Sequence, residues 1–166
     1  MRVLLAADAD WVVDEIVAAL GGPDVSFTVC TEGREVSRIV ADRTRAGEPF
    51  DIGIFDLQIG SMGGMAVTLA LRLDASAGVV PHVPVIMVLD RVADVFLGRR
   101  SGAEGWMVKP LDPLRLDRAV KVVVAGGSYR EGLDGVEILR VAPPAESVED
   151  LDPAGADVIL GPAASE

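Results

Sequence analysis

The sequence predicts an α/β fold in which a five-stranded, doubly wound parallel sheet carries helices on both faces. Short apolar runs recur along residues 2–125 without strict alternation, as expected of strands that are covered on both sides. Helical patterns separate these runs, and strands that alternate with helices favour a parallel sheet with right-handed crossovers. Acidic residues stand where apolar runs end, which is the ligand-binding edge of such a sheet.

The predicted strands are rich in apolar or β-branched residues. They are Arg2–Ala7, Val25–Cys30, Ile52–Phe55, Val83–Leu89 and Trp106–Val108. The fourth is the most hydrophobic run of the chain, so we expect it at the centre of the sheet.

A helical pattern follows each strand, and most have a start or a stop signal. Asp10 and Thr31 can cap the first two helices, and Asp112 with a following proline can begin the fifth. The third helix begins at Ser61 or a nearby glycine. Gly98 weakens the fourth by about 1 kcal/mol of helix propensity relative to alanine.

Composition divides the chain into a folded part, residues 1–125, and an acidic tail, residues 126–166. The net charge is −11, and the tail alone contributes −7. Its prolines, glycines and acids predict a largely disordered segment in which nothing beyond about residue 130 joins the core. Neither part offers the basic face that nucleic-acid binding requires. No apolar run approaches the ~18 residues of a membrane span, so we expect a soluble cytoplasmic protein that binds no membrane.

Three charged residues are predicted to converge at one edge of the sheet. In the flavodoxin-like strand order 2-1-3-4-5, Asp8 ends the first strand, Asp56 the third and Lys109 the fifth. Two carboxylates and an ammonium at this edge could hold a divalent cation and a phosphoryl group. Mg²⁺ fits best, because it accepts one or two carboxylates together with water and phosphate oxygens.

Residues 2–125 resemble the receiver domain of bacterial two-component response regulators. The similarity rests on four segments in the family's order and spacing: RVLLAAD, FDIGIFDLQIGSMGG, PVIMVL and GAEGWMVKPLDP. The resemblance implies that Asp56 is the phosphoacceptor and that Lys109 binds the phosphoryl group. It further implies that Asp8, Asp56 and the backbone carbonyl of Gln58 bind Mg²⁺. Trp106 matches the aromatic residue that turns inward on activation, although it could equally be a core residue.

The chain also departs from the family pattern at positions that matter for signalling. Ala7 replaces the first acid of the metal-binding pair, so we expect weak Mg²⁺ binding. Leu89 replaces the serine or threonine that grips the phosphoryl oxygen. Losing a hydrogen bond to a charged group costs roughly 1.5–3 kcal/mol, which is comparable to a typical allosteric coupling energy. The segment from Leu89 to Gly102 also looks about two residues shorter than usual, which places the shortfall near the fourth helix.

The resemblance implies a single-domain response regulator, not an enzyme and with no catalytic residues of its own. A histidine kinase or a phosphotransfer protein would donate to Asp56, and the output would pass to a protein partner. The face of the fourth helix, fifth strand and fifth helix would carry that contact or a homodimer. A pseudo-receiver with little or no phosphorylation-dependent switching is the alternative, which Ala7 and Leu89 favour. A flavodoxin-like cofactor binder ranks last, because no Gly-x-Gly-x-x-Gly follows the first strand.

Overall fold

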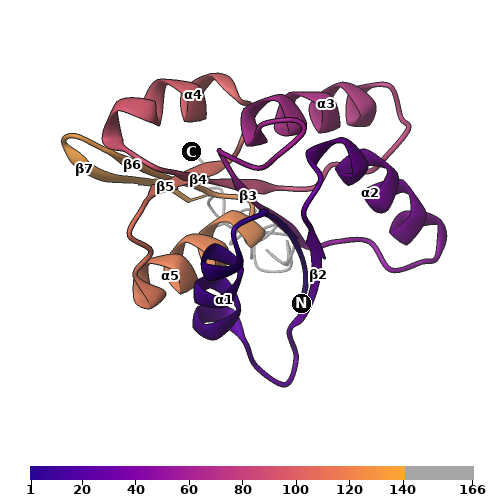
Figure 1. The fold of residues 1–166 in the computed structure, drawn as a ribbon, viewed down its shortest axis with the longest axis horizontal. Helices are drawn as coiled ribbons and strands as arrows, with labels where there is room; N and C mark the ends of the chain where they lie inside the picture. The colour runs from indigo at the N-terminus through magenta and orange to yellow at the C-terminus, as the bar shows by residue number, and fades with distance from the viewer. Residues whose placement is uncertain (141–166) are drawn as a thin grey trace, which may run out of the picture.

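A computed structural model describes residues 1–140, which form one seven-stranded sheet with helices on both faces (Figure 1). The strands are β1 (Arg2–Ala6), β2 (Ser26–Cys30), β3 (Ile52–Asp56), β4 (Val85–Leu89), β5 (Gly105–Val108), β6 (Ser128–Gly132) and β7 (Gly135–Leu139). The helices are α1 (Asp10–Leu20), α2 (Val36–Arg45), α3 (Gly64–Ser76), α4 (Val95–Arg100) and α5 (Pro113–Val124), with 3₁₀ turns at Gly33–Glu35 and Val92–Asp94.

The predicted fold class is confirmed, and so is the order of the first five strands. The sheet runs β2-β1-β3-β4-β5-β6-β7, and β1 to β5 pair in parallel. Every residue of β4 is buried, as expected for the most hydrophobic strand. Phe55 of β3 lies beside Met87 of β4, and Asp56 pairs with Val88. This register places the end of β3 at the same edge as the end of β4.

Two apolar clusters, one on each face of the sheet, hold the layers together. Helices α2, α3 and α4 cover one face, and α1 and α5 cover the other (Figure 1). Each strand contributes side chains to both clusters, because successive side chains point to opposite faces of the sheet. In β4, Met87 and Leu89 join the first cluster, whereas Ile86 and Val88 join the second.

The predicted helix starts are only partly correct. Asp112 caps α5, and its carboxylate accepts a hydrogen bond from the backbone N–H of Arg115 at 2.8 Å. Asp10 is the first residue of α1 and not its cap, which is Ala9. Thr31 does not cap α2, because a 3₁₀ turn intervenes and Glu35 precedes the helix.

The sheet has two strands more than predicted, and they lie within the predicted tail. β6 pairs in parallel with β5, and β7 returns antiparallel to β6, so Ser128–Leu139 forms a hairpin (Figure 1). Tyr129 and Glu131 are buried, so the prediction that nothing beyond about residue 130 joins the core is wrong for this hairpin. Residues 141–166 lie outside the described residues, and their predicted disorder stays a prediction.

The physical reason for this correction is that polar contacts hold β6. The sequence SYREG has one large apolar side chain, so it lacks the hydrophobic alternation that predicts a strand. Instead, hydrogen bonds to β5 and an ion pair with α5 hold this strand in the sheet. The Asp134-Gly135 dipeptide is a sequence feature that indicates this hairpin, since Asp-Gly favours tight hairpin turns.

The segment between β4 and β5 is built around a short helix, and the two-residue shortfall that the resemblance implies there stays a prediction. A 3₁₀ turn leads directly into α4, which has six residues.

Within residues 1–140, no helix has the length and apolar character that a membrane crossing requires.

Candidate functional site

Asp56 ends β3 and is the buried centre of the candidate site. Its side chain is 2% exposed, and the Lys109 ammonium reaches both carboxylate oxygens, at 3.1 Å and 3.0 Å. The backbone N–H of Gln58 donates a third hydrogen bond to Oδ1 at 3.2 Å. A buried carboxylate is stable only when it is paired and hydrogen-bonded, and these contacts supply both conditions.

Lys109 comes from the loop that follows β5 and is shared between two carboxylates. Its ammonium lies 2.8 Å from Oδ1 of Asp90 and 5.0 Å from the centre of the Trp11 ring. The Lys109–Pro110 peptide bond is cis. Burial favours the neutral amine, but the hydrogen bonds to Asp90 and then to Asp56 outweigh it and raise the pKa of Lys109 above its ordinary value. The lysine is therefore a cation at neutral pH.

Asp8 follows β1 and contacts the same loop that Asp56 contacts. Its Oδ2 accepts a hydrogen bond from the backbone N–H of Gly60 at 2.9 Å. A β-carbon at position 60 would lie only 3.0 Å from this oxygen, so the glycine permits the close approach. Thus the loop after β3 binds Asp56 through the amide of Gln58 and Asp8 through the amide of Gly60. The structure brings Asp56 and Lys109 into contact, and Asp8, from the segment between β1 and α1, contacts the loop between β3 and α3.

The donor set at this edge is chemically suited to Mg²⁺ but small. Besides Asp90, which pairs with Lys109, the edge offers the carboxylates of Asp8 and Asp56, and the Gln58 carbonyl accepts no hydrogen bond from the described residues. Hard oxygen ligands of this kind, completed by water, are what Mg²⁺ prefers. Among residues 1–140, no group of three or more His, Cys, Asp or Glu side chains is arranged to hold a metal. A bound Mg²⁺ would also have to compete with Lys109 for the oxygens of Asp56.

Leu89 and Ala7 bring apolar surface to positions where the resemblance implies polar groups. Both side chains are fully buried, on opposite faces of the sheet. Leu89 belongs to the same apolar cluster as Trp106. Neither residue can donate a hydrogen bond to an anion at Asp56.

Trp106 lies in the core and is held from three sides. Its Nε1 donates a hydrogen bond to the backbone carbonyl of Glu131 at 2.8 Å, and the Arg130 guanidinium lies 5.3 Å from its ring centre. On the α4 side, a β-carbon at Gly98 would come within 2.9 Å of the indole. The hairpin and α4 therefore fix the ring in an inward position.

The sequence analysis missed two acidic residues that complete these contacts. Asp90 follows β4 directly, so the strand-end argument that selected Asp8 and Asp56 could have found it. Glu131 is a polar residue of β6, and no signal marked it. Its carboxylate accepts hydrogen bonds from the Val108 backbone N–H and from Arg115, both at 2.8 Å.

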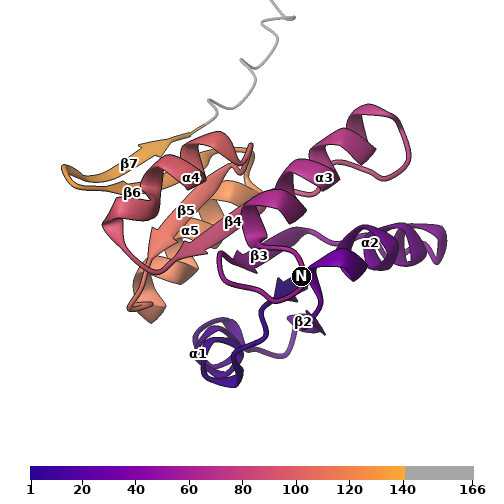
Figure 2. The same ribbon diagram turned by 45° about the horizontal axis from the view of Figure 1, so that its top comes forward.

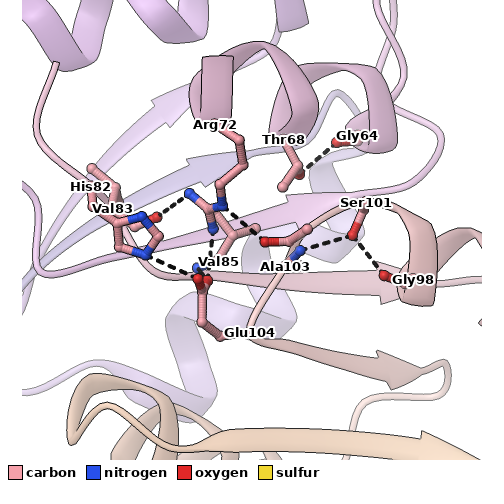
Figure 3. Close-up of polar contacts among 11 residues, drawn as sticks. Gly64, Thr68, Arg72, His82, Val83, Val85, Gly98, Ser101, Ala103 and Glu104 are labelled. Carbon is pink, nitrogen blue, oxygen red and sulfur yellow. Dashed lines mark hydrogen bonds and ion pairs between the residues drawn. The ribbon is translucent and has the colours of Figure 1, made fainter. Parts of the chain in front are cut away.

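A second polar cluster lies at the opposite ends of the strands and is structural (Figure 3). Arg72 of α3 contacts the carbonyls of Gly102 and Val83 and forms an ion pair with Glu104 at 2.7 Å. His82, for which no partner was expected, lies 3.0 Å from the same carboxylate. These contacts connect α3 to the beginnings of β4 and β5.

Comparisons with known proteins find regulatory proteins of low sequence identity. No family model matches the chain. The transcriptional regulatory protein AruR of Pseudomonas aeruginosa is 24% identical over 122 residues, which are 73% of this chain and 48% of AruR. The DNA-binding response regulator MtrA of Mycolicibacterium smegmatis is 28% identical over 122 residues, 72% of this chain and 49% of MtrA. The chain thus spans about half the length of these relatives.

Solved structures show the same fold. The signal receiver domain of a histidine kinase from Syntrophus aciditrophicus superposes with a TM-score of 0.62 at 21% identity, covering 75% of this chain and 90% of that domain. The receiver domain of the sensor histidine kinase PA1611 from Pseudomonas aeruginosa has a TM-score of 0.59 at 20% identity, covering 74% and 96%. That domain was crystallised with a magnesium ion coordinated in its active site cleft.

Proposed function

We propose that the described part of the chain, which is similar to response regulators in sequence and to receiver domains in fold, acts as a receiver domain in which Asp56 accepts a phosphoryl group. The donor is the phosphohistidine of a histidine kinase or of a phosphotransfer protein. The domain then signals in the cytoplasm through contacts with a protein partner. The observation that carries the proposal is the buried Asp56 carboxylate, both of whose oxygens contact Lys109.

The transfer exchanges one bond for another. An Asp56 oxygen supplies the electron pair for the new P–O bond, and the P–N bond of phosphohistidine breaks with its pair left on the imidazole. Lys109 neutralises charge on the phosphoryl oxygens, a role that its contacts with both Asp56 oxygens support, and preorganised charge of this kind lowers the barrier of phosphoryl transfer. Asp8, Asp56 and the Gln58 carbonyl would hold Mg²⁺, which would screen the carboxylate from the incoming phosphoryl group.

The experiment is exposure of the full chain to acetyl phosphate or beryllofluoride with Mg²⁺. We expect intact mass to increase by one phosphoryl group, and ¹⁹F spectra to show bound beryllofluoride. Asp56→Asn should abolish both signals. Asp51→Asn is the matched control, because Asp51 lies just before the same strand and contacts only the exposed start of β1. Equal modification of the Asp56→Asn variant would contradict the assignment.

A pseudo-receiver remains the second candidate function, and specific contacts favour it. Leu89 offers no donor to a phosphoryl group, Asp90 competes for Lys109, and Trp106 is fixed by its bond to Glu131. In this alternative the fold is a constitutive interaction module. Binding of beryllofluoride without amide shifts outside the site would support it over a switching receiver.

A further inference from the structure

A cleft on the α4 side of the sheet has no role in the proposed phosphorylation site. The β6–β7 hairpin extends the sheet past β5, and α4 lies beside it in both views (Figures 1 and 2). The cleft between them has a volume of about 560 Å³ and is lined by Arg99, Gly102, Ala103, Trp106, Arg130 and Glu137. Arg99 comes from α4, and Arg130 and Glu137 come from the hairpin.

Two buried polar atoms on this side of β6 have no hydrogen-bond partner among the described residues. They are Nε of Arg130 and Oγ of Ser128. The two side chains are two positions apart on one strand, so they share a face of the sheet. Buried polar groups are nearly always satisfied, and an unpaired guanidinium nitrogen beside a cleft indicates a missing acceptor. The stacking of Arg130 on Trp106 holds its guanidinium in place while leaving its N–H groups free to donate.

The cleft is basic although the whole chain is acidic. Arg99 and Arg130 make no ion pair within residues 1–140, and Glu137 is the one acid that lines the cleft. The nearby Glu104 carboxylate is already engaged by Arg72, by His82 and by the backbone N–H of Val85 (Figure 3). The carboxylate of Glu131 contacts Val108 and Arg115 instead. The balance of uncommitted charge therefore favours an anion.

The basic surface is elongated. An adjoining cleft of about 320 Å³ shares Ala103 and Arg130 with the first and adds Ser128, Arg140 and the already paired Glu104. Arg99, Arg130 and Arg140 thus follow one another from α4 across the hairpin to the end of β7. Three separated guanidiniums match several carboxylates along an extended peptide better than they match one small anion.

We propose that this α4–hairpin cleft binds an acidic peptide segment of a partner protein. The carboxylates accept hydrogen bonds from Arg99 and Arg130, including the unpaired Nε, and a further acid reaches Arg140. The inference goes beyond the proposed function by naming a surface and the chemistry of its partner. It does not require Asp56 to be phosphorylated, so the two proposals can fail separately.

The test uses the full chain and an octaglutamate peptide as the probe. We expect binding to shift the side-chain Nε–H resonances of Arg99 and Arg130 and to weaken at high salt. Arg99→Gln should weaken binding about tenfold, since it removes a charge-assisted contact from an exposed helix position. Glu137→Gln should strengthen binding, because it removes the one acid from the cleft. Arg34→Gln is the matched control, since this arginine is exposed in the 3₁₀ turn that follows β2, the strand at the other edge of the sheet.

Three outcomes would overturn the proposal. Equal weakening by Arg34→Gln would mean that the peptide binds the surface nonspecifically. Inorganic phosphate that binds as tightly as the peptide and shifts the same resonances would mark a single-anion site. The third outcome concerns a full-chain variant in which four acids are changed to amides: Glu146, Glu149, Asp150 and Asp152. If this variant binds the probe much more tightly, the cleft binds the chain's own acidic residues and not a partner.

Discussion

Asp90 is the most distinctive residue of this site, because the Lys109 ammonium contacts its carboxylate as well as that of Asp56. Its Oδ1 lies 2.8 Å from Nζ, closer than either oxygen of Asp56. A phosphoryl group on Asp56 would have to attract Lys109 away from Asp90 and would repel the Asp90 carboxylate. Leu89, one position earlier, offers no compensating donor.

We therefore expect Asp90→Asn to accelerate acceptance of the phosphoryl group. A hydrogen bond to a charged group contributes about 1.5–3 kcal/mol, but Asp90 is about a third exposed, so solvent reduces its effect and an increase of a few-fold is reasonable. The measurement is the rate of mass increase with acetyl phosphate. Asp117→Asn is the control, because it removes a carboxylate from a comparable lysine pair on α5. A slower Asp90→Asn variant would mean that Asp90 assists the reaction.

Leu89→Thr tests whether the missing hydroxyl is what limits switching. The variant should enlarge the beryllofluoride-induced amide shifts of residues 90–94, because the new hydroxyl can bind the anion and draw this loop inward. Trp106 emission should change little, since its Nε1 remains bonded to Glu131. The substitution removes buried apolar atoms and should cost roughly 2–4 kcal/mol of stability. Val88→Thr is the control, because that equally buried position faces the other side of the sheet. A full receiver-like response in the unmodified chain would show that Leu89 is no obstacle.

At the scale of elements, packing of α4 on β5 depends on a glycine inside the helix. Gly98 of α4 lies over the Trp106 indole, and an added β-carbon would approach two ring atoms at 2.9 Å. The ring cannot retreat easily, because Arg130 and Glu131 hold it from the hairpin side.

Gly98→Ala should therefore destabilise the domain even though alanine favours a helix. Overpacking costs typically 1–3 kcal/mol, which exceeds the gain of about 1 kcal/mol in helix propensity. The free energy of unfolding can be measured with denaturant. Gly22→Ala is the comparison, since a β-carbon at Gly22 meets no atom within 4 Å and should leave stability nearly unchanged. Increased stability of the Gly98→Ala variant would show that α4 shifts without cost.

The sequence predicts the elements that depend on apolar periodicity and misses those held by polar contacts. The five parallel strands and the Asp112 cap follow from local pattern, and strand-end logic selects Asp56 and Lys109, which are in contact. Nothing in the sequence SYREG indicates that Glu131 would bond to Val108 and Arg115, because these partners are set by tertiary packing. The contact between Lys109 and Asp90 is a different case, because the position of Asp90 directly after β4 is visible in the sequence.

At the scale of the whole molecule, three buried or partly buried groups among residues 1–140 resist losing a proton in the folded state. Burial raises the pKa of the Cys30 thiol and that of the Tyr129 hydroxyl, and the bonds to Asp90 and Asp56 outweigh burial to raise the pKa of Lys109. A folded pKa above the unfolded value stabilises the fold at low pH and loses that contribution as pH rises. The free energy of unfolding should hence fall from about pH 9 upward. Tyr129→Phe should reduce the slope above about pH 10. A free energy that is flat between pH 8 and pH 11 would contradict the sign of these shifts.

The hairpin also changes how this domain can associate with another copy. A homodimer through α4, β5 and α5 would use a surface on which the edge of β5 is already paired with β6. The Glu131 carboxylate bonds to Val108 and Arg115, so it ties β5 and α5 to the same hairpin. Opening this edge would leave these partners and the Trp106 Nε1 unsatisfied, at roughly 1–3 kcal/mol for each buried group.

We accordingly expect beryllofluoride to leave the oligomeric state of the full chain unchanged. Sedimentation velocity with and without beryllofluoride and Mg²⁺ should give the same sedimentation coefficient at concentrations up to about 100 µM, where pairs with a Kd of 1 µM (about −8.2 kcal/mol) would be dimeric. Bound beryllofluoride must be verified by ¹⁹F spectra, and Asp56→Asn provides the unliganded control. A ligand-dependent dimer that Glu131→Ala strengthens would mean that the hairpin opens on activation and that β5 returns to the surface as an interface.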